Sequence, residues 1–158
     1  MQLVLGLGLG VLLSIAVIGF AVYKVRARVR ALRTAGRARA DAEVLRGRTP
    51  AVLDDSALFF GLQSKGPVQL RGNGCLVLVD DELVFLQWVT DRVVRVPLAD
   101  VIAVDTARGH LGKRIARDLL RVRWRVDGRE ETAAWFVHDL AAWLDHLRGT
   151  EAGVHAAT

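Results

Sequence analysis

The chain has 158 residues, a formal net charge of +5 and one cysteine, Cys75, which excludes an internal disulfide and a thiolate-rich metal site. This length allows one modest domain plus an appended segment. The charge is unevenly placed, because residues 24–48 hold nine basic and two acidic side chains (+7), whereas residues 49–158 hold thirteen basic and fifteen acidic ones (−2). A near-neutral domain argues against nucleic-acid binding, which requires a basic domain surface.

The N-terminal segment is apolar, and residues 3–23 contain no charged side chain. A helix of this length spans roughly 30 Å, the thickness of the hydrocarbon core of a bilayer. No basic region precedes the run and no small-residue cleavage site follows it, so a cleaved signal peptide fits poorly. The sequence therefore predicts a transmembrane helix at residues 1–23. Gly6, Gly10 and Ser14 are spaced by four, which leaves a homodimer through close helix approach as an open alternative.

Residues 24–49 form a basic segment with no proline before Pro50, and we expect the helix to continue to about Leu45, weakened at Gly36. Cytoplasmic flanks of membrane helices collect lysine and arginine, which predicts a plasma-membrane protein with its N-terminus outside and its C-terminal domain in the cytoplasm. The juxtamembrane cations are expected to hold anionic lipid headgroups, and they are Lys24, Arg26, Arg28, Arg30 and Arg33.

Residues 50–149 have the pattern of a small domain. The stretch at 46–56 looks like a linker that leads into its first predicted strand. We interpret the acidic clusters at 54–56 and 80–82 as solvated turns, Asn73-Gly74 and Asp127-Gly128 as hairpin turns, and residues 107–117 as a polar loop or helical turn. Eight β-branched and aromatic runs predict a sheet of about seven short antiparallel strands, and these runs are 57–63, 68–72, 75–79, 82–89, 92–98, 101–106, 118–126 and 129–137.

The end of the domain is helical in pattern. Leu140, Trp143, Leu144 and Leu147 form one apolar stripe, so an amphipathic helix is expected to cap the open end of the sheet through Trp143. Asp139 is a suitable N-cap and Gly149 a suitable terminator, which leaves residues 150–158 as a flexible tail. The predicted fold class is therefore a transmembrane helix followed by an α+β domain.

The texture of "DDELVFLQW" and "RVVRVPLADVIAVDT", with a closing helix after "WFVHDL", resembles a bacterial pleckstrin-homology-like domain of the GRAM-like sort over residues 57–148. This resemblance implies a curved sheet or barrel that is capped by its C-terminal helix. The layout is also similar to an uncharacterised actinobacterial family of small single-span membrane proteins. A phosphoinositide pocket is not implied, because only Lys65 and Arg71 are available near the first two strands.

Residues that could support catalysis do not converge in the sequence. His138 and His146 are eight positions apart, too far for one metal ion, and Cys75 lies in an apolar run that is typical of a core strand. We therefore expect no enzyme activity and no catalytic, cofactor or metal site. The alternative is an accessory hydrolase or transferase with an unrecognised site, which a closed cleft with converging titratable groups would favour.

One basic pattern stands out in the domain. Arg121, Arg123 and Arg125 alternate with apolar residues, so they are expected to share the outer face of a strand. The preceding segment adds Arg108, His110, Lys113, Arg114 and Arg117. This face is either solvated and balanced by Glu130 and Glu131, or it binds anionic lipid or an acidic protein. The predicted function is a membrane-anchored cytoplasmic interaction module that binds protein or anionic lipid at the inner leaflet.

Overall fold

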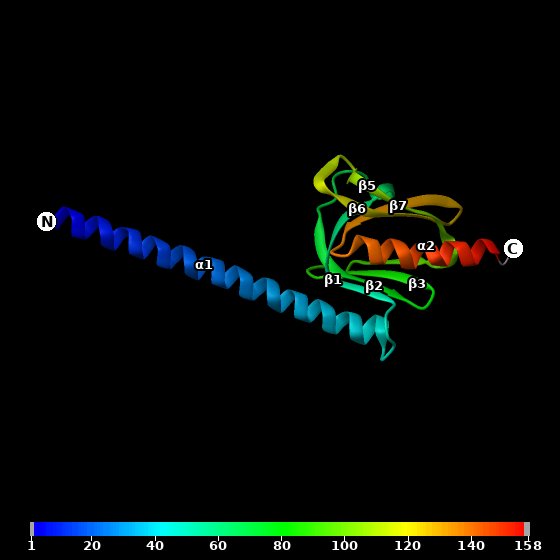
Figure 1. Ribbon diagram of the computed structural model, residues 1–158, viewed down its shortest axis with the longest axis horizontal. Helices are drawn as coiled ribbons and strands as arrows, with labels where there is room; N and C mark the ends of the chain where they lie inside the picture. The colour runs from blue at the N-terminus through cyan, green and yellow to red at the C-terminus, as the bar shows by residue number, and fades with distance from the viewer. Residues whose placement is uncertain (1, 157–158) are drawn as a thin grey trace.

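The computed structural model describes the backbone of residues 2–156 and the side chains of residues 13–149. A long helix is followed by seven strands and a second helix, which confirms an α+β sheet domain (Figure 1). The elements are α1 (Gln2–Ala40), β1 (Val52–Leu62), β2 (Gly72–Val79), β3 (Glu82–Gln87), β4 (Val93–Pro97), β5 (Val101–His110), β6 (Lys113–Val126), β7 (Arg129–Phe136) and α2 (Leu140–Ala156).

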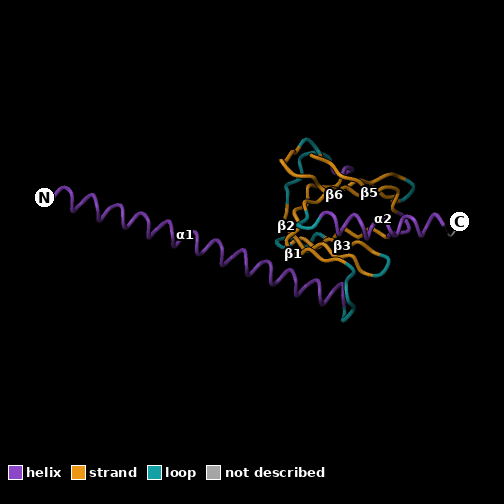
Figure 2. The backbone as a smooth tube through the Cα atoms, in the orientation of Figure 1, coloured by secondary structure: helices purple, strands orange, loops and turns teal. Residues whose placement is uncertain are grey.

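The seven strands form one antiparallel sheet in the order β4-β3-β2-β1-β7-β6-β5. Strand β1 joins the two halves, because its first part pairs with β2 and its last part pairs with β7. Register shifts on both sides of β1 increase its bend, so the sheet curves around α2, with β2 and β3 on one side of this helix and β5 and β6 on the other (Figures 1 and 2). The two edge strands, β4 and β5, do not pair with each other, so the sheet is open and is not a closed barrel.

The main core fills the concave side of the sheet. Phe59, Phe85 and Trp135 meet in tilted contacts with ring centroids 5.1–6.3 Å apart. Helix α2 adds Trp143, which is 1% exposed, so the predicted burial of this side chain is confirmed. The Asp139 carboxylate accepts the Ala142 amide at 3.0 Å, which confirms the predicted N-cap.

The predicted end of α2 is wrong. The helix continues through Gly149 to Ala156, so residues 150–156 belong to α2 rather than to a separate tail. A single glycine costs a helix only about 1 kcal/mol relative to alanine, which is too little to end a helix whose next residues are compatible with it. Residues 157–158 of the predicted tail lie outside the described residues.

The end of α1 covers part of the convex side of the sheet. Ala40, Val44 and Leu45, the last two in a π-helical turn at Asp41–Leu45, are buried against β2 and β3, where Cys75 also lies in the core as predicted. The approach is close, because a Cβ atom at Gly36 would lie 2.4 Å from Trp88 Cδ1. The rest of α1 projects away from the domain (Figure 1).

The prediction of a transmembrane helix is corrected by the structure. Within the described part of the chain, no helix is long and apolar enough to cross a membrane. The side chains of residues 1–12, including Gly6 and Gly10 of the predicted dimer face, lie outside the described residues. The predicted membrane orientation, with the N-terminus outside and the C-terminal domain in the cytoplasm, was based on the transmembrane helix predicted at residues 1–23.

Several predicted turns and strands also differ from the structure. Asp54, Asp55 and Ser56 lie within β1, and Asn73-Gly74 lies within β2, so neither is a turn. Residues 68–72 were predicted as a strand, but 66–71 belong to the connection between β1 and β2. The expected polar loop at 107–117 continues β5 and β6 around a tight turn at Leu111 and Gly112, where φ is +51° and +74°.

Candidate functional site

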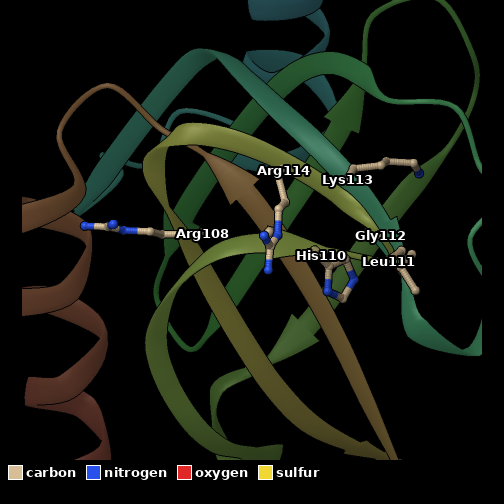
Figure 3. Close-up of a pocket in the computed structure, with 7 residues that line it drawn as sticks. Arg108, His110, Leu111, Gly112, Lys113 and Arg114 are labelled. Carbon is tan, nitrogen blue, oxygen red and sulfur yellow. The ribbon is translucent and has the colours of Figure 1, made fainter.

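A cleft of about 360 Å³ lies at the turn of the β5–β6 hairpin. Its lining residues come from one continuous segment and include three of the cations singled out in the sequence: Arg108, Gly109, His110, Leu111, Gly112, Lys113 and Arg114. Figure 3 shows that Arg108 and Lys113 extend in opposite directions, with Arg114 and His110 between them. Three sequence-predicted basic residues, Arg108, Lys113 and Arg114, therefore lie at the same end of the sheet as His110.

The hairpin turn is fixed against the end of β1. His110 Nε2 donates to the Gly61 carbonyl at 3.1 Å, so this ring nitrogen carries the proton. Leu111 packs against Gly61, where a Cβ atom would lie 2.9 Å from Leu111 Cδ1. Lys113 Nζ donates to the Phe60 carbonyl at 3.1 Å and also to the Gln69 carbonyl. The Lys113 ammonium therefore has a structural role, and the cleft has a rigid wall.

His110 is kept neutral by its surroundings. Burial lowers the pKa of its imidazole below the ordinary value of 6.5, and the neighbouring charges of Arg121 and Lys113 act in the same direction. The hydrogen bond to the Gly61 carbonyl opposes this effect. At neutral pH the positive charge of the cleft therefore comes from its arginines and lysine. His110 lines the cleft and ties the hairpin to Gly61.

The Arg71 side chain lies against the backbone of Arg114. An Arg71 guanidinium nitrogen donates to the Arg114 carbonyl at 3.4 Å, and the same guanidinium lies 4.5 Å from the centroid of the Phe60 ring. Both side chains are exposed, and within the described residues neither has a carboxylate at ion-pair distance. Arg108 differs, because its Nε lies 3.3 Å from Asp118.

The arginines of β6 alternate with buried apolar residues, as the sequence predicted, but they are not equivalent. Arg121 makes two hydrogen bonds to Asp105, at 2.6 and 2.7 Å, which lower the pKa of the Asp105 carboxyl. Arg123 is half-buried, and among the described residues its Nε has no partner. Arg125 is exposed opposite Glu130. Arg117 lies over the Phe136 ring at 5.7 Å.

Among the described residues, the predicted neutralising carboxylates Glu130 and Glu131 form no ion pair with the arginines of β6. Glu131 is buried and accepts hydrogen bonds from Ser64 N at 3.1 Å, from the Ser64 hydroxyl and from Thr132 N at 2.9 Å. It therefore holds the start of the β1–β2 connection. Asp105, on the neighbouring strand, neutralises Arg121 instead, and no local sequence signal reveals this pairing because it depends on strand register.

The cations of α1 fall into two groups. Arg33 forms an ion pair with Asp55 at 2.6 Å, which raises the pKa of Arg33 and lowers that of Asp55, so Arg33 helps to dock α1 on β1. Lys24, Arg26, Arg28 and Arg30 are exposed on the projecting part, where Lys24 lies 5.4 Å from the Phe20 ring centroid. Within the described residues this second group has no carboxylate at ion-pair distance.

A second cleft, of about 310 Å³, lies between α1, β1 and the start of α2. Buried Asp54 accepts the His138 amide at 2.7 Å and the Ser56 amide at 2.9 Å, and it lies 3.0 Å from His138 Nδ1. These bonds join β1 to the entry of α2. The Ser56 hydroxyl contacts Asp54 and Asp55 rather than His138, so no nucleophile–base pair is assembled here. Among the described residues, no group of histidine, cysteine and carboxylate side chains is arranged to hold a metal ion.

No family model, curated protein or solved structure matches this chain.

Proposed function

We propose that this protein is an interaction module that binds an anionic lipid surface through the end of its sheet where the β5–β6 turn meets the β1–β2 connection. We call this the hairpin surface and define it as Lys65, Arg71 and Arg114 with the cleft at the β5–β6 turn. The observation that carries the proposal is that the Arg71 side chain is held against the Phe60 ring and the Arg114 backbone, next to the exposed Arg114 side chain, and that among the described residues neither side chain has a carboxylate partner.

Exposed, unpaired cations are suited to lipid phosphates for two reasons. An arginine guanidinium binds phosphate oxygens through charge-assisted hydrogen bonds, and its geometry allows two at once. Each cation near an anionic leaflet contributes about 1 kcal/mol to binding. Arg71 is already oriented by the Phe60 ring, so it loses less side-chain freedom on binding than a free arginine would.

The distribution of charge favours a lipid surface over an acidic protein. Exposed cations without a carboxylate partner among the described residues lie on the hairpin surface, on the projecting part of α1 and at other turns, where Arg92 and Arg129 are examples, so they do not form one complementary patch. A lipid leaflet presents mobile negative charge over a wide area and so can meet dispersed cations together, whereas a protein partner needs a matched surface of about 800 Å². Acidic-protein binding is the outcome that would replace this proposal.

The test measures the partition of the full chain into phosphatidylcholine vesicles with and without phosphatidylglycerol. The exposed apolar side chains at 13–23 can associate with any bilayer, so the informative quantity is the ratio of anionic to neutral partition. Arg71→Gln with Arg114→Gln should lower this ratio roughly 30-fold, because about 2 kcal/mol is lost.

The matched control is Arg92→Gln with Arg129→Gln, which removes the same charge from two exposed arginines at other turns. The control should retain most of the preference for anionic vesicles. Equal losses in both double variants would mean that only net charge matters and would contradict the hairpin surface. Absence of any preference in the unmodified chain would contradict lipid binding altogether.

A further inference from the structure

The connection between β1 and β2 carries two unusually exposed apolar side chains. Val68 is 90% exposed and Leu70 is 84% exposed, the highest values among the large hydrophobic residues that the structure describes. Single exposed apolar residues are ordinary on protein surfaces. Two within three positions, both almost fully in solvent, form an apolar tip that the rest of the domain leaves uncovered.

This tip is held in place by the residue between the two apolar side chains. Gln69 turns inward, where its Oε1 accepts the Leu62 amide at 3.1 Å and its Nε2 donates to the Leu62 and Gly66 carbonyls at 2.6 and 2.8 Å. Lys113 from the β5–β6 hairpin donates to the Gln69 carbonyl. The connection is therefore tied to β1 and to the hairpin while Val68 and Leu70 remain outside.

Cations flank the apolar tip. Lys65 and Arg71 are exposed at the two ends of the connection, and Arg71 reaches the backbone of Arg114 across the hairpin. Glu131 is the carboxylate that contacts the connection, and it is buried and occupied by Ser64 and Thr132. An apolar tip between cations is complementary to an anionic lipid interface, where phosphates lie above acyl chains.

We infer that the β1–β2 connection inserts Val68 and Leu70 into the headgroup–acyl boundary of an anionic bilayer, with Lys65, Arg71 and Arg114 placed at the phosphates. This inference rests on the proposed function and adds a contact mode and an orientation to it. A protruding tip of two side chains buries little area against a protein surface, whereas a fluid bilayer closes around it. The apolar contacts add to binding in a way that salt does not screen.

The experiment uses the full chain with a single environment-sensitive fluorophore, nitrobenzoxadiazole, attached at Leu70→Cys. The native Cys75 stays unlabelled near neutral pH, because burial raises the pKa of its thiol to about 12 and keeps it protonated. The matched control carries the fluorophore at Val89→Cys, since Val89 is 75% exposed on the β3–β4 connection. We expect a blue shift and increased emission at position 70 with phosphatidylglycerol-containing vesicles and no change at position 89.

A second measurement uses unlabelled variants. Val68→Asn with Leu70→Asn should lower partition into phosphatidylglycerol-containing vesicles at least roughly tenfold, whereas Val89→Asn should leave it unchanged. All three positions are exposed, so these variants keep the fold.

The outcomes separate the two proposals. Charge-selective vesicle binding with an aqueous probe at position 70, or with equal shifts at 70 and 89, overturns the insertion while leaving the proposed function intact. If the unmodified chain shows no preference for anionic vesicles, both proposals are overturned.

Discussion

Two arginine-rich regions of this protein use the same side chain in different ways. Where α1 docks on the sheet, the arginines meet carboxylates: Arg33 pairs with Asp55, Arg37 with Asp41, Arg39 with Glu43 and Arg48 with Asp80. At the hairpin surface, Arg71 contacts the Phe60 ring and the Arg114 backbone instead, and neither Arg71 nor Arg114 has a carboxylate partner among the described residues. The comparison teaches that the positions of the acidic residues, rather than the density of arginine, decide which cations are available to a partner.

The largest expected effect comes from the core that supports both regions. Trp143→Ala should reduce the free energy of unfolding of the full chain by roughly 3–5 kcal/mol, because a fully buried aromatic is removed from the concave side of the sheet. Chemical denaturation followed by circular dichroism measures this loss. A change below about 1 kcal/mol would show that α2 does not hold the sheet together.

The docking of α1 can be broken without touching any charge. Gly36→Ala places a Cβ atom 2.4 Å from the Trp88 ring, so we expect a destabilisation of about 1–3 kcal/mol and faster hydrogen exchange of the amides at 41–45. Gly19→Ala in the same helix is the control, since nothing lies within 4 Å of its added Cβ. Unchanged exchange in Gly36→Ala would contradict the tight contact between α1 and the sheet.

The folded protein is predicted to lose stability in mild acid because of His110, which lines the cleft of the hairpin surface. Because burial lowers its pKa below 6.5, the unfolded chain binds a proton at higher pH than the folded protein does. Stability is therefore complete above about pH 6.5 and falls as the pH drops below it. Asp55, Asp105 and Glu131 have lowered pKa values, so their losses begin only below their ordinary values of 3.8–4.5.

Thermal unfolding measured from pH 7.5 to 5 should show this slope, and His110→Gln should reduce it. A slope that persists unchanged in His110→Gln would assign the acid sensitivity to another group.

The smallest effect distinguishes paired from unpaired arginines directly. Arg121→Gln should cost about 0.2–1 kcal/mol of stability, because it breaks the half-exposed pair with Asp105. Arg114→Gln should cost less than about 0.5 kcal/mol. Denaturant midpoints of the two variants, measured side by side, test this order. A larger cost for Arg114→Gln would mean that this residue has a structural role.

Elements with strong local patterns were predictable from the sequence. The stripe of Leu140, Trp143 and Leu147 indicated α2, and the alternation of Arg121, Arg123 and Arg125 with apolar residues indicated a strand with one buried face. These patterns are local, because each depends only on the period of one element. The transmembrane prediction was also based on a local pattern, and it is not supported by any helix among the described residues.

Features that depend on strand register or on distant contacts were not predictable. The segment Asp54-Asp55-Ser56 resembles a turn in the sequence, yet Asp54 is buried in β1, where it accepts the amide of His138, which is 84 positions away. Similarly, the pairing of Asp105 with Arg121 and the bonds of Lys113 to Phe60 and Gln69 follow from how β1, β5 and β6 meet. These contacts separate structural cations from available ones, and no short-range pattern encodes them.

The central claim is that Arg71 and Arg114 are available to an anionic surface, and its most direct test is the salt dependence of vesicle partition. For the full chain, the ratio of anionic to neutral partition should fall steeply as salt rises from 0.05 to about 0.5 M, since the Debye length shrinks over this range. Arg71→Gln with Arg114→Gln should show a lower ratio at low salt and a shallower slope, while Arg92→Gln with Arg129→Gln should follow the unmodified chain. Identical slopes for the two double variants would contradict the claim.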